Sequence, residues 1–121
     1  MRSAVPKLQG AAAAMIAEDF RRIALSFPDT AESAHMNHPD FRVKGKVFAT
    51  LGYPEEGWAM VKLPPAQQAE FVELQPSAFA SVKGGWGRQG ATNVRLKAVQ
   101  EDALRGALTI AWQTASQKKK K

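Results

Sequence analysis

Residues 41–51 read FRVKGKVFATL, and this stretch decides the fold class. Two runs of β-prone side chains, 41–43 and 47–51, flank Lys44-Gly45-Lys46, a glycine-containing turn that is typical of a β-hairpin. Strands joined by so short a turn pair antiparallel, because a parallel pair needs a long crossover connection. The stretch therefore predicts two neighbouring strands of an antiparallel sheet.

Further strands are expected on both sides of this hairpin. A short polar stretch at 31–37 favours an edge strand, which ends at a predicted turn over 38–40, where a proline lies. Residues 58–63 and 91–97 alternate between two sets of side chains, as strands with two different faces do. Residues 77–83 lead into the glycine-rich residues 84–90, which predict an irregular segment.

Helices are predicted where apolar residues recur at helical spacing. The first spans 11–27 and ends before Pro28, which cannot continue the hydrogen-bond ladder. The second spans 65–74 and opens on a proline, which suits the first helical position. The third spans 100–115, with acidic residues in its first turn and an apolar stripe along one side.

The element order is close to α-β-β-β-α-β-β-α. It predicts an α+β domain of two layers, with an antiparallel sheet of about five strands and about three helices that cover one face. We expect a single domain over 11–117, a flexible N-terminus over 1–10 and a disordered lysine tail over 118–121.

Composition excludes several classes of function. The chain has no cysteine, which excludes disulfides, thiolate metal sites and cysteine nucleophiles. Its net charge of +6 arises in the termini, because Arg2, Lys7 and 118–121 hold six of the 17 basic residues and leave 11 against 11 acidic ones. Without a signal peptide or an apolar run of membrane-spanning length, the expected location is cytoplasmic, with no membrane partner.

Motifs for cofactors, metals and catalysis are weak. Residues 85–90 (GWGRQG) match a dinucleotide-binding spacing, but they lead into a predicted strand where that motif requires a helix, so the match is accidental. His35, His38 and Asp40 could hold a metal ion, although a structural or surface role is the stronger interpretation. We expect no catalytic residue, no cofactor and no metal, and only a deep pocket around these three side chains would favour an enzyme.

Residues 74–100 contain no acidic side chain and surround Trp86 with glycines and cations. The tryptophan could stack on a base while the cations contact phosphates, with the turn at 44–46 as a second basic tip. Alternatively, Trp86 caps the core and the charges only solubilise the surface. The candidate nucleic-acid-binding residues are Lys44, Lys46, Lys83, Trp86, Arg88, Arg95 and Lys97.

Several short motifs occur in an order that resembles the MmcQ/YjbR-like family. In the first half these are Phe27-Pro28-Asp29-Thr30, Glu32, Phe41-Arg42-Val43 and Gly45-Lys46-Val47-Phe48-Ala49. In the second half they are Leu63, Ala69, Phe71, the Gly-Trp-Gly at 85–87, Val94-Arg95-Leu96 and Ala111-Trp112. The resemblance covers about residues 13–115. It implies a two-layer, CyaY-like fold similar to type III secretion chaperones and a double-wing DNA-binding role, and it carries over no catalytic residue.

Two functions stay open on the sequence alone. The first is a non-enzymatic module that binds nucleic acid, DNA above all, through basic hairpins. The alternative is a protein-interaction or adaptor module that uses a chaperone-like sheet face to bind a protein partner or a second copy of itself.

Overall fold

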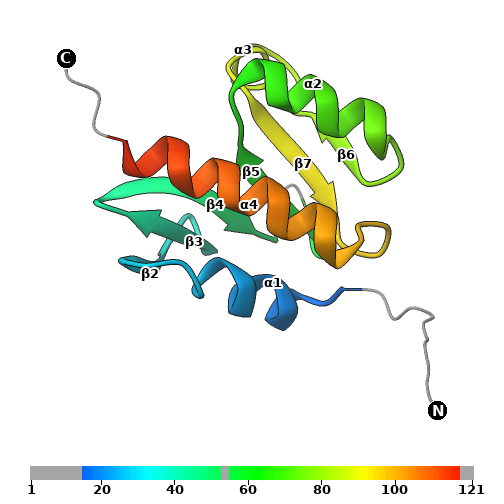
Figure 1. Ribbon diagram of the computed structural model, residues 1–121. Helices are drawn as coiled ribbons and strands as arrows, with labels where there is room; N and C mark the ends of the chain where they lie inside the picture. Colours follow the sequence, from blue (N-terminus) through cyan, green and yellow to red (C-terminus); the bar gives the residue numbers. More distant parts are fainter. Residues whose placement is uncertain (1–14, 53–54, 118–121) are drawn as a thin grey trace.

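The structure, a computed structural model, describes residues 15–52 and 55–117 and shows one antiparallel sheet packed against helices (Figure 1). Six strands pair in the order β2-β3-β4-β5-β7-β6. The strands are β2 (Thr30–His35), β3 (His38–Val43), β4 (Lys46–Leu51), β5 (Trp58–Lys62), β6 (Phe79–Ser81) and β7 (Ala91–Arg95). The helices are α1 (Ala17–Ala24), α2 (Pro65–Leu74), α3 (Gly85–Arg88) and α4 (Glu101–Ser116).

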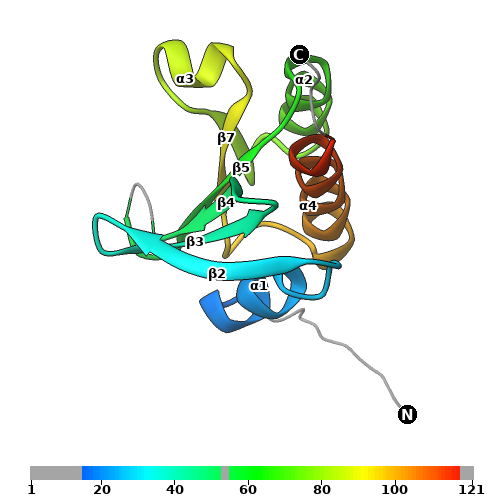
Figure 2. The same ribbon diagram turned by 90° about the vertical axis from the view of Figure 1, so that its left-hand side faces the viewer.

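The long helices lie on one side of the sheet. Figure 2 shows α4 and α2 side by side along this side, which we call the helix-covered face. α4 contacts β3, β4 and β5, and α1 contacts both α4 and β4. The opposite side, the open face, has no helix laid across it in the described part of the chain, and α3 stands at one end of it (Figure 2).

The hydrophobic core fills the space between the sheet and the helices. The ring of Phe20 in α1 packs against that of Phe41 in β3, with centroids 5.9 Å apart. A register shift between β3 and β4 pairs Phe41 with Ala49 and Arg42 with Val47, so the partner strand gains the extra residue Phe48, which is also buried. The largest fully buried apolar side chains are Phe20, Phe41, Phe48, Phe79, Ile23, Leu104, Leu108, Val43, Val61 and Val94.

The structure corrects the predicted turn over 38–40. The hairpin instead turns at Met36 and Asn37, whose φ angles of 51° and 67° are left-handed, and residues 38–40 belong to β3. Pro39 is tolerated in this strand because β3 pairs with β4 only from Asp40 onward. At Pro39 the strand therefore has a neighbour on one side only. The amide proton that proline lacks is not needed there for a hydrogen bond to a second neighbouring strand.

The glycine-rich segment is also more regular than predicted. Residues 79–81 form the short strand β6, and residues 85–88 form one helical turn, so the structure has six strands and four helices in its described part. A Cβ atom on Gly87 would lie 1.6 Å from the carbonyl oxygen of Val82. The glycine is thus required by close packing of α3 against the end of β6, and glycine content here does not signal an irregular loop.

The α+β fold and the antiparallel sheet are confirmed, with element limits shifted by a few residues. The helix predicted over 11–27 spans Ala17–Ala24, and the strand predicted over 91–97 ends at Arg95. The predicted flexible N-terminus (1–10) and lysine tail (118–121) lie outside the described residues. Within 15–52 and 55–117, no helix combines the length and the apolar character that crossing a membrane requires.

Candidate functional site

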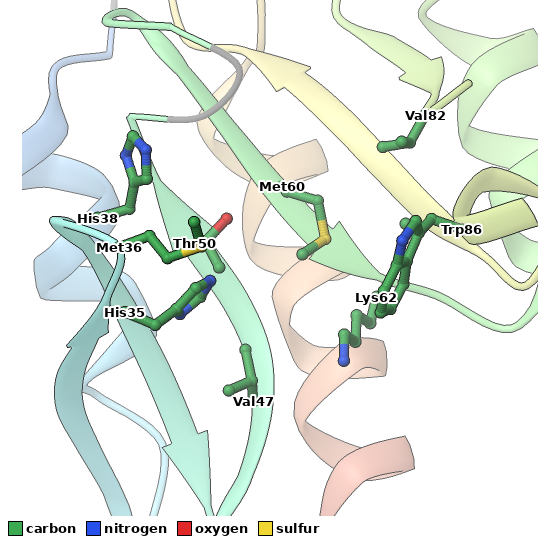
Figure 3. A pocket seen from close by; sticks show the side chains of 10 residues that line it. His35, Met36, His38, Val47, Thr50, Met60, Lys62, Val82 and Trp86 are labelled. Atoms are coloured by element: carbon green, nitrogen blue, oxygen red, sulfur yellow. The ribbon is translucent and has the colours of Figure 1, made fainter. Parts of the chain in front are cut away.

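The open face contains a hollow of about 570 Å³ between the β2–β3 turn and α3 (Figure 3). Its volume falls in the range of ligand pockets, which is roughly 300–1,000 Å³. Most of its lining is apolar. The lining residues are His35, Met36, His38, Val47, Thr50, Met60, Lys62, Val82, Trp86 and Ala91.

The floor of the hollow follows from strand pairing. Thr50 of β4 lies opposite Met60 of β5, and Met60 lies opposite Asn93 of β7. Directly paired residues of antiparallel strands point to the same side of the sheet, so these three side chains form one row on the open face. Their sequence neighbours, including Val61 and Val94, point into the core instead.

One rim of the hollow is the β2–β3 turn. Met36 at this turn keeps 85% of its surface exposed and has a left-handed backbone, a conformation that is unfavourable for a long side chain. Neither burial nor turn geometry accounts for a methionine at this position. A flexible, polarisable side chain on a rim is, however, well suited to contact a ligand.

Behind this rim lies a cluster of one acid and two basic groups. Asp40 is completely buried, and its carboxylate accepts hydrogen bonds from Arg42, Nε to Oδ1 at 2.8 Å and Nη2 to Oδ2 at 3.0 Å. His35 Nδ1 lies 2.6 Å from Asp40 Oδ2. The Arg42 hydrogen bonds hold the pKa of Asp40 below its ordinary value of 3.8, burial opposes this lowering, and the His35 hydrogen bond adds to it.

The cluster orients His35 toward the hollow. With Nδ1 held by Asp40, the ring nitrogen Nε2 is the one left to face a ligand, and Figure 3 shows the imidazole beside Met36 and Thr50. A buried carboxylate behind an imidazole also occurs in hydrolytic sites, where a hydroxyl nucleophile completes the set. Here the hydroxyl of Thr50 makes no hydrogen bond to any described residue.

The metal interpretation finds no support in the described residues. Within 15–52 and 55–117, no group of three or more histidine, cysteine, aspartate or glutamate side chains could hold an ion. Asp40 is engaged by Arg42 as well as by His35.

The other rim is residues 82–90, which we call the α3 segment. Trp86 projects from it with 66% of its surface exposed, and the ammonium of Lys62 lies 5.9 Å from the centre of its ring. Two glycines fix the segment, because a Cβ atom would lie 1.6 Å from a backbone oxygen at Gly87 and likewise at Gly90. Gln68 of α2 donates from Nε2 to the Gly87 and Ala91 carbonyls, at 3.0 and 2.9 Å. Trp86 is thus presented on a rigid support.

The structure separates the predicted site residues into three places. Lys83, Trp86 and Arg88 lie together, exposed, in the α3 segment. Lys44 and Lys46 flank the β3–β4 turn, where the Lys44 ammonium donates to the Ser116 carbonyl at 3.1 Å.

The third place is the far end of β7. Arg95 lies with its guanidinium carbon 4.7 Å from the ring centre of Trp58, and the exposed Lys97 follows in the next turn. Arg95 is four residues from Ala91, which borders the hollow, so the two Cα atoms are about 13 Å apart along the strand.

Sequence reasoning overlooked the floor of the hollow. Thr50, Met60 and Lys62 line it, and none of them was among the predicted site residues. The alternation in residues 58–63 did assign Met60 and Lys62 to one strand face. The alternation does not reveal the strand order of the sheet, and the strand order decides that this face is the open one.

Charge is distributed unevenly over the domain. Helices α1, α2 and α4 contain six acidic and three basic residues, whereas the remaining described residues contain five acidic and eight basic ones. The ten residues that line the hollow include Lys62 and no acid. The strands, turns and α3 are therefore the basic part of a domain that is neutral as a whole.

Comparison with known proteins gives a family and a fold. The family model described as YjbR matches residues 25–114. A crystal structure of a Deinococcus radiodurans protein with the domain DUF419 matches at a TM-score of 0.66 and 17% identity, over 80% of this chain and 75% of that one. A Pseudomonas syringae protein solved in a structural genomics programme matches at a TM-score of 0.63 and 13% identity, over 84% of this chain and 99% of that one. The search of curated proteins gave no match.

Proposed function

The chain belongs to the YjbR family, and from that premise we propose that it is a non-enzymatic module that binds nucleic acid through the α3 segment. The observation that carries this proposal is the exposed Trp86 on its rigid support, with Lys62, Lys83 and Arg88 around it. An indole of this exposure contributes little to the core. It offers a flat surface for a nucleobase, and stacking of this kind stabilises binding by about 1–3 kcal/mol per base.

The basic side chains supply the second part of the interaction. Lys83 and Arg88 are exposed on both sides of Trp86 in the sequence and belong to the basic part of the domain. Contacts between such cations and phosphates release counterions, so affinity falls as salt rises. In a double-wing arrangement the β3–β4 turn, with Lys44 and Lys46, is the second contact and the α3 segment the first.

Binding of a fluorescently labelled DNA over a series of salt concentrations tests this proposal. The substitutions Arg88→Ala and Lys83→Ala should each weaken binding and reduce the salt dependence by about one phosphate contact. Arg105→Ala is the matched control, because Arg105 lies on α4 and pairs there with Glu101. It removes the same charge and should leave the affinity unchanged.

The lysines at 118–121 would add non-specific attraction, so the same series is run with all four changed to serine. If that variant shows no DNA binding at low salt, or if Arg105→Ala weakens binding as much as Arg88→Ala, the proposal is wrong. A general charge effect would then explain any retention on DNA.

A protein-interaction role is the second candidate, and the exposed apolar rims favour it. Met36 and Trp86 are exposed by 85% and 66% on opposite sides of a mainly apolar hollow. Exposed apolar surface of this kind marks interaction sites. Sedimentation analysis of the wild type and of Met36→Glu distinguishes this role from nucleic-acid binding. A second copy or a protein partner that is held by apolar contacts dissociates when Met36 is replaced by glutamate, but not when the salt concentration is raised.

A further inference from the structure

We infer that the hollow on the open face is a binding site for one nucleotide unit, a heterocyclic base with its phosphate, taken either from an unpaired strand or from free solution. This inference rests on the proposed nucleic-acid-binding function and extends it from the rim to the floor of the hollow. It implies a preference for single strands over duplexes, which the basic rim alone does not require.

The first observation is an unsatisfied hydroxyl at the floor. Thr50 lines the hollow and is only 4% exposed, yet its Oγ1 has no hydrogen-bond partner among the described residues. Asn93 Oδ1 is the other buried side-chain atom in this state within the described chain. Both residues belong to the row on the open face that runs through Met60. Buried polar atoms normally find partners. Asn93 is not among the residues that line the hollow, so Thr50 is the group that the inference assigns to the ligand.

The second observation is the arrangement of the walls around this floor. Figure 3 shows Trp86 on one side, His35 and Met36 on the other, and Met60 between them. The indole offers a stacking surface. The floor offers a hydroxyl to the edge of a base, and the opposite wall offers an imidazole nitrogen. Aromatic stacking combined with a few hydrogen bonds to the base edge is how proteins hold a base that has left its stack.

The third observation is charge, which favours a nucleotide over a protein segment. The lining contains Lys62 and no acidic residue, and Lys83 and Arg88 lie on the adjoining rim. An anion with an aromatic body satisfies both features, because the ring contacts the apolar walls and the phosphate contacts the ammonium groups. A base inside a duplex is paired and stacked, so it does not reach a floor below the rim.

The test compares three probes on the intact protein: single-stranded oligothymidylate, a duplex of the same length, and thymidine 5′-monophosphate. The single strand should bind more tightly than the duplex. Thr50→Val keeps the shape of the side chain and removes the hydroxyl, so it should weaken single-strand binding about 3- to 10-fold and leave duplex binding unchanged. Its thermal unfolding should occur at no lower temperature than that of the wild type, which separates loss of a ligand contact from loss of structure.

The monophosphate distinguishes the two sources of the nucleotide. Saturable binding that Thr50→Val weakens to the same extent supports a site for free nucleotides, and binding of the strand alone supports a site for an unpaired base. Met60→Trp fills the hollow from its floor and gives a second variant, which should abolish the preference for single strands.

Two results would overturn the inference. Equal single-strand affinity of Thr50→Val, Met60→Trp and the wild type would show that the hollow is not used, while the Arg88→Ala and Lys83→Ala results would still decide the proposed function separately. Binding of none of the three probes by the wild type would overturn both.

Discussion

Thr92 and Thr50 are both almost inaccessible to solvent, but they lie on opposite faces of the sheet. Thr92 faces the helices, and its hydroxyl donates to the Gly90 carbonyl at 2.9 Å. Thr50 faces the hollow, and its hydroxyl has no partner among the described residues. The two threonines differ in what their hydroxyls do: that of Thr92 takes part in the fold, whereas that of Thr50 is the one that the inferred ligand would contact.

The same difference appears in the aromatic side chains. On the helix side, Trp112 stacks on Phe27 with ring centres 5.6 Å apart and donates from Nε1 to the Pro28 carbonyl at 3.0 Å. Trp86 beside the hollow is 66% exposed. Features that do not stabilise a fold but persist in it tend to gather at functional sites. Substitutions at Thr50 and Trp86 should therefore affect binding more than stability.

Gly87→Ala should have the largest effect on stability. The new Cβ atom would lie 1.6 Å from the Val82 carbonyl oxygen, so the α3 segment must move, and we expect the free energy of unfolding to fall by about 2–3 kcal/mol. Gly85→Ala is the control, because its Cβ atom would meet only the Arg88 side chain at 3.7 Å. Urea denaturation of both variants measures the difference. Similar values for the two would show that the rim is not rigidly packed.

Asp40→Asn should have the next largest effect and should change the pH dependence of stability. The amide loses the charged hydrogen bonds from Arg42 and His35, so we expect the free energy of unfolding at neutral pH to fall by about 1–2 kcal/mol. The pKa of Asp40 is lowered in the folded protein, chiefly by Arg42. Its contribution is therefore complete above the unfolded carboxyl's pKa and is lost as pH falls through the folded value.

Denaturation curves of Asp40→Asn and the wild type, measured from neutral to acidic pH, test this linkage. The two proteins should differ most at neutral pH and converge below about pH 4. A constant difference at all pH values would mean that the loss comes from packing rather than from the charge on Asp40.

Valine substitutions at the two threonines should have smaller effects of opposite sign. Thr92→Val breaks the hydrogen bond to Gly90 and should lower the free energy of unfolding by about 1 kcal/mol. Thr50→Val removes a buried hydroxyl that has no partner and should raise it by up to about 1 kcal/mol. Thermal and urea unfolding measure both. A loss of stability in both variants would contradict the distinction between the two faces.

The elements of the fold that depend on a local sequence pattern could be predicted from the sequence. The hairpin over 41–51 and the α2 limits follow from turn residues and from the position of a proline. The helical turn at 85–88 does not, because the packing of Gly87 on Val82 is a contact between segments. The turn at Met36 and Asn37 was missed because the proline two residues later is the stronger local signal.

The candidate site was predicted only at its rim. Trp86, Lys83 and Arg88 are neighbours in sequence, so an acid-free, glycine-rich stretch was enough to indicate them. Thr50 and Lys62 come from different strands, and only the pairing of β4 with β5 brings them to one hollow. The burial of Asp40 was equally invisible, since an aspartate after a proline is typical of a turn.

Trp86→Leu should have the smallest effect on stability and a large one on binding. The indole is mostly exposed, and leucine suits a helical turn, so we expect the free energy of unfolding to change by no more than about 0.5 kcal/mol. Stacking on a base is lost, which corresponds to a decrease in single-strand affinity of about 5- to 150-fold. Trp112→Leu serves as the opposite control, because it removes a ring stack and a hydrogen bond from the helix side. Urea denaturation and oligonucleotide titration of both variants measure the stability and the affinity. If Trp86→Leu unfolds as easily as Trp112→Leu, the indole of Trp86 stabilises the fold, and the open face is not specialised for binding.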